Sequence, residues 1–401
     1  MKTKNNLTYL VCFFVVLSCF LNFTVSEAAS PGKKSIRLGL LVPYTGIYAS
    51  LGRDLTNGIK LYLKQIGGEV NGHEIVLITK DSKGDPATGL TKTRELVEND
   101  NAEILTGYVH SGVILAARDY VHTNKIPMVV ICGSARAVTQ DRKSPHIFRT
   151  IRAGGQQERA AGWYLATKTG IKRAITVYPD YVMGYEGEDG FKTLFTKYGG
   201  KIVDSILPAI ATADYGPFLG KIADKAKEAD AVVCGFSGAD GVKFVNQFAA
   251  FGLREKIPIW GWSDMVDYSL LPAEGDNAMG FNFYSDWDLT LDLPENRKFV
   301  ESFRKEYQVD PGIFNQHGYV GAKAICMALE KVGGDLSNME RFLEALRAVK
   351  FPSTRGAFYF DKDQNPVNDV YIGKVEKVDG KIVRRIYDVV RNVDQHWMGP
   401  K

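Results

Sequence analysis

Short apolar runs alternate with amphipathic segments of helical period along most of the chain, starting at Ile36. The runs have the length and composition of buried strands, and the segments between them are long enough to be helices. Strands that alternate with helices form parallel sheets, because each helix returns the chain to the same end of the sheet. The pattern predicts an α/β fold with strands at 36–42, 74–79, 103–106, 127–132, 174–178, 231–234 and 258–260, and helices at 51–65, 87–99, 112–124, 156–169, 186–198, 216–227 and 241–251.

Two segments of the chain are similar to each other. LGLLVPYTGIYASLGRDLTNGIKL and AITVYPDYVMGYEGEDGFKTL both contain a strand, a loop with aromatic residues, and then an acidic residue and a glycine that open a helix. Two such halves, each starting a doubly wound sheet, predict two lobes. After Gly280 the pattern changes to helices at 295–307, 315–332 and 338–348 and strands at 357–360, 370–378 and 382–390. If these late helices pack on the first lobe, the lobes are discontinuous, and we expect 29–152 with 284–358 and 153–283 with 359–401.

The first 28 residues have the features of a secretory signal. Lys2 and Lys4 precede an almost wholly apolar run over 7–21, and Ser26 and Ala28 supply the small residues that signal peptidase reads. We therefore expect a signal peptide over 1–28 and a periplasmic mature protein. A permanent membrane anchor also fits the length of the run, although polar side chains within it weaken that alternative. Lipidation at Cys19 is a less favoured alternative, because the bulky Leu17 fits a lipobox poorly.

Composition excludes several classes of protein. The chain has 401 residues, of which 45% are hydrophobic, and a net charge of only +4, so neither a disordered protein nor a nucleic-acid binder is expected. Cleavage of the signal leaves Cys132, Cys234 and Cys326, an odd number that implies at least one free thiol. No CxxC pair or cysteine–histidine cluster occurs, so the sequence predicts no metal site.

Catalytic motifs are also missing from the sequence. No GxGxxG follows the first strand, no GxxxxGK[ST] occurs, and the six histidines show no HExxH spacing. Gly235-Phe236-Ser237-Gly238-Ala239 resembles a nucleophile elbow but lacks its closing glycine, so an ordinary strand-to-helix turn is the better interpretation. We therefore expect a binding protein with no catalytic residues and no cofactor.

Ligands of open parallel sheets bind beyond the carboxyl ends of the strands, next to helix N-termini. Ser111 follows the strand at 103–106 at the predicted N-cap of the next helix. Ser134, Ala135 and Arg136 follow the strand at 127–132, in a loop of small residues whose N–H groups suit an anion. Three hydrogen bonds to a charged group, at about 1.5 to 3 kcal/mol each, balance the several kcal/mol that burying a carboxylate costs. These residues predict a carboxylate site.

Aromatic residues follow other strands and predict an apolar wall for the same site. Tyr48 and Tyr181 lie in corresponding loops of the two halves, and Phe236 and Trp262 follow later strands. Asp264 follows Trp262 closely and either receives a ligand ammonium or caps the following segment.

The order and spacing of several segments resemble the type I periplasmic solute-binding proteins, specifically the leucine/isoleucine/valine-binding branch of ABC-importer receptors. The resemblance covers about 36–390 and rests on LVPYTG at 41–46, Gly52, Gly58, Asp81, Asp85-Pro86, Glu95-Leu96-Val97, Gly107, Ser111, HIFRT at 146–150, Asp180-Tyr181, Gly184 and Gly261. It implies two Rossmann-like lobes with parallel central sheets, joined by three crossovers, that close on a ligand without catalysis.

The resemblance extends to some predicted site residues but not to all. It implies that Ser111 binds a ligand carboxylate, and that Ser134 and Ala135 provide further donors. Arg136 stands where amino-acid binders commonly carry threonine, and Ser263 stands where leucine-type receptors use a glutamate for the ligand ammonium. Without that acid an α-amino acid is a poorer ligand, whereas an arginine and several rings suit an aromatic acid.

The sequence thus predicts an exported, monomeric receptor that delivers a small hydrophobic carboxylate, either an amino acid or an aromatic acid, to the permease of an ABC importer. A ligand-sensing domain on the same fold is an alternative, but it needs a membrane or effector segment and none follows Lys401. An exported hydrolase that uses Ser237 is a third possibility.

Overall fold

The computed structural model describes residues 35–400, which contain two mixed sheets. The first sheet has the order β2-β3-β1-β4-β5-β6, and its strands are parallel except for the edge strand β2. The strands are β1 (Ser35–Val42), β2 (Glu69–Val70), β3 (His73–Asp81), β4 (Ile104–Gly107), β5 (Met128–Val130) and β6 (Ile147–Arg149). The elements between them are α1 (Ala49–Gln65), α2 (Pro86–Glu98), α3 (Ser111–Thr123) and the short 3-10 helix η1 (Arg136–Thr139).

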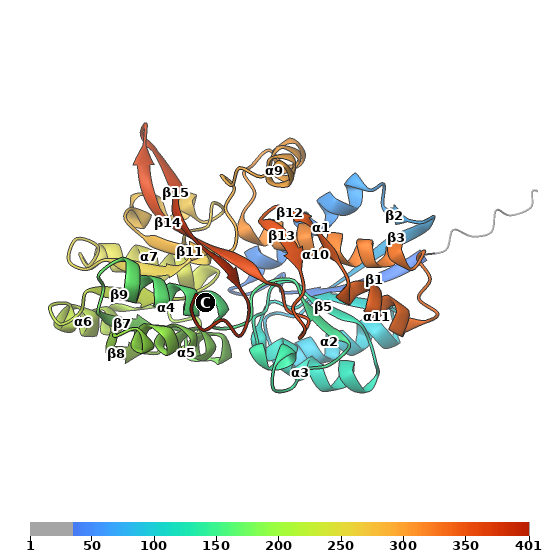
Figure 1. The fold of residues 1–401 in the computed structure, drawn as a ribbon, viewed down its shortest axis with the longest axis horizontal. Helices are drawn as coiled ribbons and strands as arrows, with labels where there is room; N and C mark the ends of the chain where they lie inside the picture. The colour runs from blue at the N-terminus through green and yellow to red at the C-terminus, as the bar shows by residue number, and fades with distance from the viewer. Residues whose placement is uncertain (1–34, 401) are drawn as a thin grey trace, which may run out of the picture. The chain divides into compact units, whose positions relative to one another are not determined.

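The second sheet has the order β15-β14-β11-β10-β9-β7-β8. In Figure 1 its red strands, β14 and β15, come from the C-terminal part of the chain, and they pair antiparallel beside the parallel strands. The strands are β7 (Arg173–Val177), β8 (Lys201–Ile206), β9 (Ala231–Cys234), β10 (Ile259–Trp262), β11 (Asn282–Ser285), β14 (Asn368–Val378) and β15 (Lys381–Val393). The helices are α4 (Gln156–Lys168), α5 (Val182–Lys197), α6 (Gly216–Lys225), α7 (Ala239–Ala250), η2 (Ser263–Val266), α8 (Leu271–Glu274) and η3 (Gly275–Ala278).

The segment between β11 and β14 packs with the first sheet. It contains α9 (Pro294–Tyr307), α10 (Ile313–Lys331), α11 (Met339–Arg347), β12 (Lys350–Ser353) and β13 (Gly356–Tyr359), and its apolar side chains share one core with those of β1 and α1. Helices α1 and α10 approach backbone to backbone at two glycines. A Cβ on Gly58 would lie 1.9 Å from the carbonyl oxygen of Asn315, and one on Gly318 would lie 2.1 Å from that of Leu55.

The chain therefore passes between the two sheet-bearing lobes three times: from β6 to α4, from β11 to α9, and from β13 to β14. This arrangement confirms the predicted α/β fold with two lobes and parallel central strands. The predicted residue boundaries of the lobes remain a prediction. The predicted signal peptide and Cys19 lie outside the described residues.

The sequence pattern missed some strands and misplaced several helix starts, most of all that of α5, which begins at Val182 rather than at 186. Strands β2, β6, β8, β11 and β12 are absent from the prediction, because they are short or contain many polar or aromatic residues. The N-cap of α3 is His110 rather than Ser111, which is the first residue of the helix. Within residues 35–400, no helix is both long and apolar enough to span a membrane.

Candidate functional site

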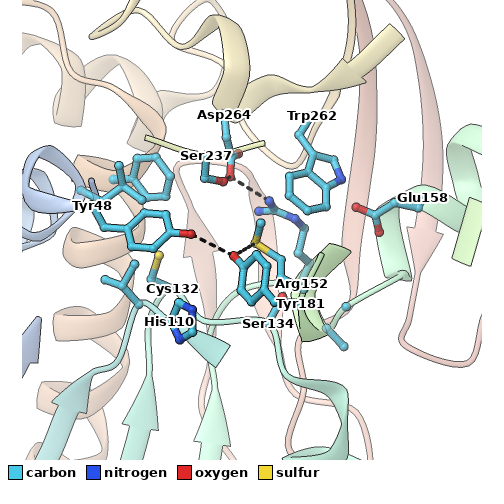
Figure 2. A pocket seen from close by; sticks show the side chains of 16 residues that line it. Tyr48, His110, Cys132, Ser134, Arg152, Glu158, Tyr181, Ser237, Trp262 and Asp264 are labelled. Atoms are coloured by element: carbon cyan, nitrogen blue, oxygen red, sulfur yellow. Dashed lines mark hydrogen bonds and ion pairs between the residues drawn. The ribbon is translucent and has the colours of Figure 1, made fainter. Parts of the chain in front are cut away.

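A cavity lies where loops from the carboxyl ends of the parallel strands of both sheets meet (Figure 2). It contains about 470 Å³ of atom-free space, part of which is open to solvent. Its walls come from the loops after β1, β4, β5 and β6 of the first lobe and after β7, β9 and β10 of the second lobe. The polar and aromatic lining residues are Tyr48, His110, Cys132, Ser134, Arg152, Glu158, Tyr181, Ser237, Trp262 and Asp264.

Arg152 supplies the positive charge of this cavity. It follows β6 in the first connection between the lobes, and it is only 7% exposed. Its guanidinium donates to Asp264 at 3.0 Å and lies 5.8 Å from the ring centroid of Trp262. Burial alone would lower the pKa of Arg152, but Asp264 and further carboxylates outweigh burial and raise it. Arg152 is therefore a fixed cation in the cavity.

Asp264 is held by residues of both lobes. Besides Arg152, the Ser237 hydroxyl donates to the same carboxylate oxygen of Asp264 at 3.3 Å. The residue is 3% exposed, so its charge needs these partners. The ion pair makes this part of the cavity close to neutral before any ligand enters.

Three aromatic side chains connect the lobes across the cavity. The hydroxyl of Tyr48, in the loop after β1, donates to that of Tyr181, after β7, at 3.3 Å. His110, after β4, stacks on Tyr181 with ring centroids 4.9 Å apart and planes 9° apart. Burial raises the pKa of Tyr48 to about 12, so its hydroxyl stays protonated. These contacts join the two lobes at the cavity.

Glu158 lies at the start of α4 and faces the cavity beside Trp262 (Figure 2). It is 1% exposed. Burial raises the pKa of Glu158 to about 7, although Arg152 and the Trp262 side chain oppose this shift. A substantial fraction of Glu158 is therefore neutral at neutral pH.

The structure brings five of the ten residues predicted from sequence to the cavity: Tyr48, Ser134, Tyr181, Trp262 and Asp264. The hydroxyl oxygen of Ser134 is buried and has no hydrogen-bond partner within residues 35–400. It is thus a donor that faces the cavity and is available to a ligand.

The other five do not line the cavity: Ser111, Ala135, Arg136, Phe236 and Ser263. Ser111 and Ser263 are buried in the first turns of α3 and η2. The carbonyl of Ala135 accepts a hydrogen bond from Arg149, and Phe236 stacks on Phe244 in the core of the second lobe.

Arg136 has a different partner from the one that the sequence suggested. Its guanidinium donates to Asp189 at 2.7 Å, and its backbone N–H contacts both carboxylate oxygens of Glu186 at 3.1 Å. Both acids belong to α5, so Arg136 links the first lobe to the second beside the cavity. The turn of η1 directs its side chain there.

Sequence reasoning missed five of the polar and aromatic cavity residues: His110, Cys132, Arg152, Glu158 and Ser237. The sequence contains a signal for Arg152, because this residue follows a short strand and precedes a helix, as ligand-binding residues of such sheets do. The signal was weak because β6 has only three residues. His110 directly precedes Ser111 after β4, so the predicted loop lines the cavity through His110, and the ligand-binding role of Ser111 stays a prediction.

Comparison with known proteins places this geometry in a family. The family model described as "Periplasmic binding protein" matches residues 35–381. The chain belongs to this family.

Solved structures of similar proteins agree with this assignment. An ABC transporter substrate-binding protein from Sphaerobacter thermophilus is 34% identical, with a TM-score of 0.85 over 90% of this chain and 99% of that one. A solute-binding protein of an ABC transporter from R. palustris, in complex with benzoate, is 32% identical, with a TM-score of 0.84 over the same shares of the two chains. Among curated proteins, the Leu/Ile/Val-binding protein homolog 6 of Brucella melitensis is 28% identical over 86% of this chain and 88% of its own length.

The periplasmic binding protein fold and the predicted role as the solute-binding receptor of an ABC transporter are thus confirmed, in preference to a sensory domain. Its relatives are solute-binding proteins and not enzymes. Among residues 35–400, Cys132, Cys234 and Cys326 are all free, and no group of three or more histidine, cysteine or acidic side chains is arranged to hold a metal ion.

Proposed function

We propose that this periplasmic binding protein captures a small aromatic carboxylate and delivers it to the permease of an ABC importer. The observation that carries the proposal is the guanidinium of Arg152, buried in a cavity whose walls are aromatic rings. Rings bury the apolar part of such a ligand, and the cation holds its carboxylate.

Arg152 has donors to spare for a ligand. A guanidinium has five N–H groups, and among the described residues one of its nitrogens donates, to Asp264. The free hydroxyl of Ser134 lies in the same cavity, so two groups of the first lobe can share a carboxylate. Hydrogen bonds to a charged group contribute roughly 1.5 to 3 kcal/mol each, which is enough to offset the desolvation of one carboxylate.

A ligand ammonium has weaker support. It needs an ionised carboxylate. One oxygen of Asp264 already accepts from Arg152 and Ser237, while its Oδ1 has no hydrogen-bond partner within residues 35–400. Glu158 has a pKa of about 7 and is therefore partly neutral at neutral pH. The relative from R. palustris that is solved with benzoate supports an aromatic acid without an amino group. The Brucella relative is named for leucine, isoleucine and valine, so these amino acids are the ligands to test against.

The remaining parts of the proposal concern the setting of the protein. We propose cleavage of residues 1–28, a periplasmic monomer with no lipid at Cys19, and binding without catalysis or nucleic acid. The hydrogen bond of Ser237 goes to Asp264, and no histidine within residues 35–400 bonds to Ser237, which argues against a catalytic serine.

Isothermal titration of the purified protein with benzoate, 4-hydroxybenzoate, phenylalanine and leucine tests the proposal. We expect the two aromatic acids to bind at least tenfold more tightly than either amino acid. Because a ligand that binds only the folded state stabilises it by about 2.7 kcal/mol at 100 times its Kd, thermal unfolding provides a second readout. Tight binding of leucine, with no binding of either benzoate, would overturn the assignment.

A further inference from the structure

The imidazole of His110 occupies an unusual position, since it is both the N-cap of α3 and a wall of the cavity. The backbone N–H of Gly112 donates to its Nδ1 at 3.1 Å. A backbone amide is always the donor in such a pair, so Nδ1 must carry a lone pair and no hydrogen. The helix cap therefore determines which ring nitrogen can be protonated.

The charge state of His110 completes the assignment. The residue is 8% exposed, and burial lowers its pKa, although Asp85 partly opposes the shift. A neutral imidazole whose Nδ1 accepts a hydrogen bond carries its single hydrogen on Nε2. Other groups that pack against this ring are aromatic: Tyr181 stacks on it, and the ring of Tyr48 lies 5.9 Å away between centroids.

The Nε2 atom is buried and has no hydrogen-bond partner within residues 35–400. Because Nδ1 is turned toward α3, the ring edge that carries Nε2 faces away from that helix. A buried donor without a partner costs about 1 to 3 kcal/mol. A ligand oxygen that accepts a hydrogen bond from this donor removes that cost and therefore binds more tightly.

We infer that His110 is a specificity-determining residue of this site: its Nε2–H, fixed by the cap of α3, donates to an oxygen of the bound carboxylate. The inference rests on the proposed function and sharpens it. The first lobe then presents three donors, from His110, Ser134 and Arg152, whereas the carboxylate of Asp264 belongs to the second lobe. The three donors of the first lobe bind the carboxylate end of a ligand. They disfavour any ligand that offers a hydrogen-bond donor at that end.

Two variants separate this role from the structural ones. Asparagine is among the best N-cap residues, so His110→Asn keeps an acceptor for the N–H of Gly112. The same variant removes the imidazole ring and its Nε2–H donor. His110→Phe keeps a ring to stack on Tyr181 but removes both nitrogens. The only loss that the two variants share, apart from imidazole itself, is the Nε2–H donor.

We expect both variants to bind benzoate at least about tenfold more weakly than the wild type, and to lose less affinity for benzamide, whose oxygen carries no charge. Urea unfolding should show a loss of stability mainly in His110→Phe, which lacks the cap. Unchanged benzoate affinity in both variants would overturn the inference, as would an equal loss for benzamide and benzoate.

Nuclear magnetic resonance of histidine labelled with ¹⁵N gives a readout that does not depend on the ligand. In the free protein at pH 7, His110 should show the Nε2–H tautomer, and its Nε2 resonance should shift when benzoate is added. An Nδ1–H tautomer or an imidazolium would contradict the inference. If the wild type binds leucine and not benzoate, the proposed function fails, but the same variants titrated with leucine still test His110 as a carboxylate donor.

Discussion

At the scale of single residues, two arginines in similar sequence positions have different environments. Arg136 follows β5 and pairs with Asp189 across the lobes, whereas Arg152 follows β6 and lines the cavity. Replacing a buried, hydrogen-bonded charge at a binding interface costs about 2 to 5 kcal/mol. We therefore expect Arg152→Gln to weaken the binding of benzoate by at least roughly 30-fold in isothermal titration.

Because Arg152→Gln leaves Asp264 as a buried charge without its cation, the double variant Arg152→Gln with Asp264→Asn removes the pair as a neutral unit. It should fold with nearly the stability of the wild type and bind benzoate as weakly as the single variant. Arg136→Gln is the matched control, and its effect on affinity should be several-fold smaller because it does not touch the cavity. Equal losses at Arg136 and Arg152 would show that both act through closure of the lobes.

At the scale of elements, the N-terminus of α7 in the second lobe contacts the loop after β1 in the first. The backbone N–H of Ala239 donates to the carbonyl of Ile47 at 3.2 Å. A Cβ on Gly238 would lie 2.5 Å from that carbonyl oxygen, so only glycine permits the contact. Overpacking costs about 1 to 3 kcal/mol, and here the cost falls on the closed state alone. We expect Gly238→Ala to weaken benzoate at least about fivefold and to reduce the compaction that ligand produces in small-angle X-ray scattering.

Gly252, just beyond the other end of α7, provides the control for this substitution. Gly238 and Gly252 have φ angles of +63° and +70°, so alanine strains the backbone at both positions. The strain is greater at Gly238, whose ψ of −142° lies close to a region that essentially only glycine adopts. A Cβ on Gly252 meets no atom within 4 Å. Both variants should lose stability in urea, Gly238→Ala the more, but Gly252→Ala should keep the affinity and the compaction of the wild type.

The sequence predicted elements well where apolar residues dominate and poorly elsewhere. The runs that became β5 and β9 read MVV and AVVC and contain only apolar residues. In contrast, β8 reads KIVDSI and β11 reads NFYS, so neither has the pattern of a buried strand. The rule that ligands bind beyond the strand ends selected loops that line the cavity. It could not choose between Ser111 and His110, or between Arg136 and Arg152, because side-chain directions in a short turn depend on tertiary contacts that a sequence does not display.

At the scale of the whole molecule, several buried carboxyl groups retain protons near neutral pH. Burial raises the pKa of Asp54, Glu158 and Glu186 to about 7, and that of Glu274 to about 8. In an unfolded chain the same groups ionise near pH 4, and histidines lose their protons near pH 6.5. Above pH 6.5 the folded state therefore binds more protons than the unfolded state, so the free energy of unfolding must fall as pH rises.

Glu274 gives this dependence its sharpest test. It is 3% exposed, and neither carboxylate oxygen has a hydrogen-bond partner within residues 35–400. Burial and the nearby Asp267 raise its pKa and outweigh the opposing effect of Arg384. Since its folded pKa is raised, its stabilising proton is fully held at low pH and lost as pH rises through about 8. From pH 6.5 to 8.5 the free energy of unfolding of the wild type should fall by about 1 to 2 kcal/mol through this group.

Urea unfolding of two variants tests this expectation. Glu274→Gln, which mimics the protonated acid, should remove this part of the pH dependence, and Glu301→Gln, at an exposed position in α9, should retain it. Identical slopes in all three proteins would show that Glu274 is already ionised at pH 6.5.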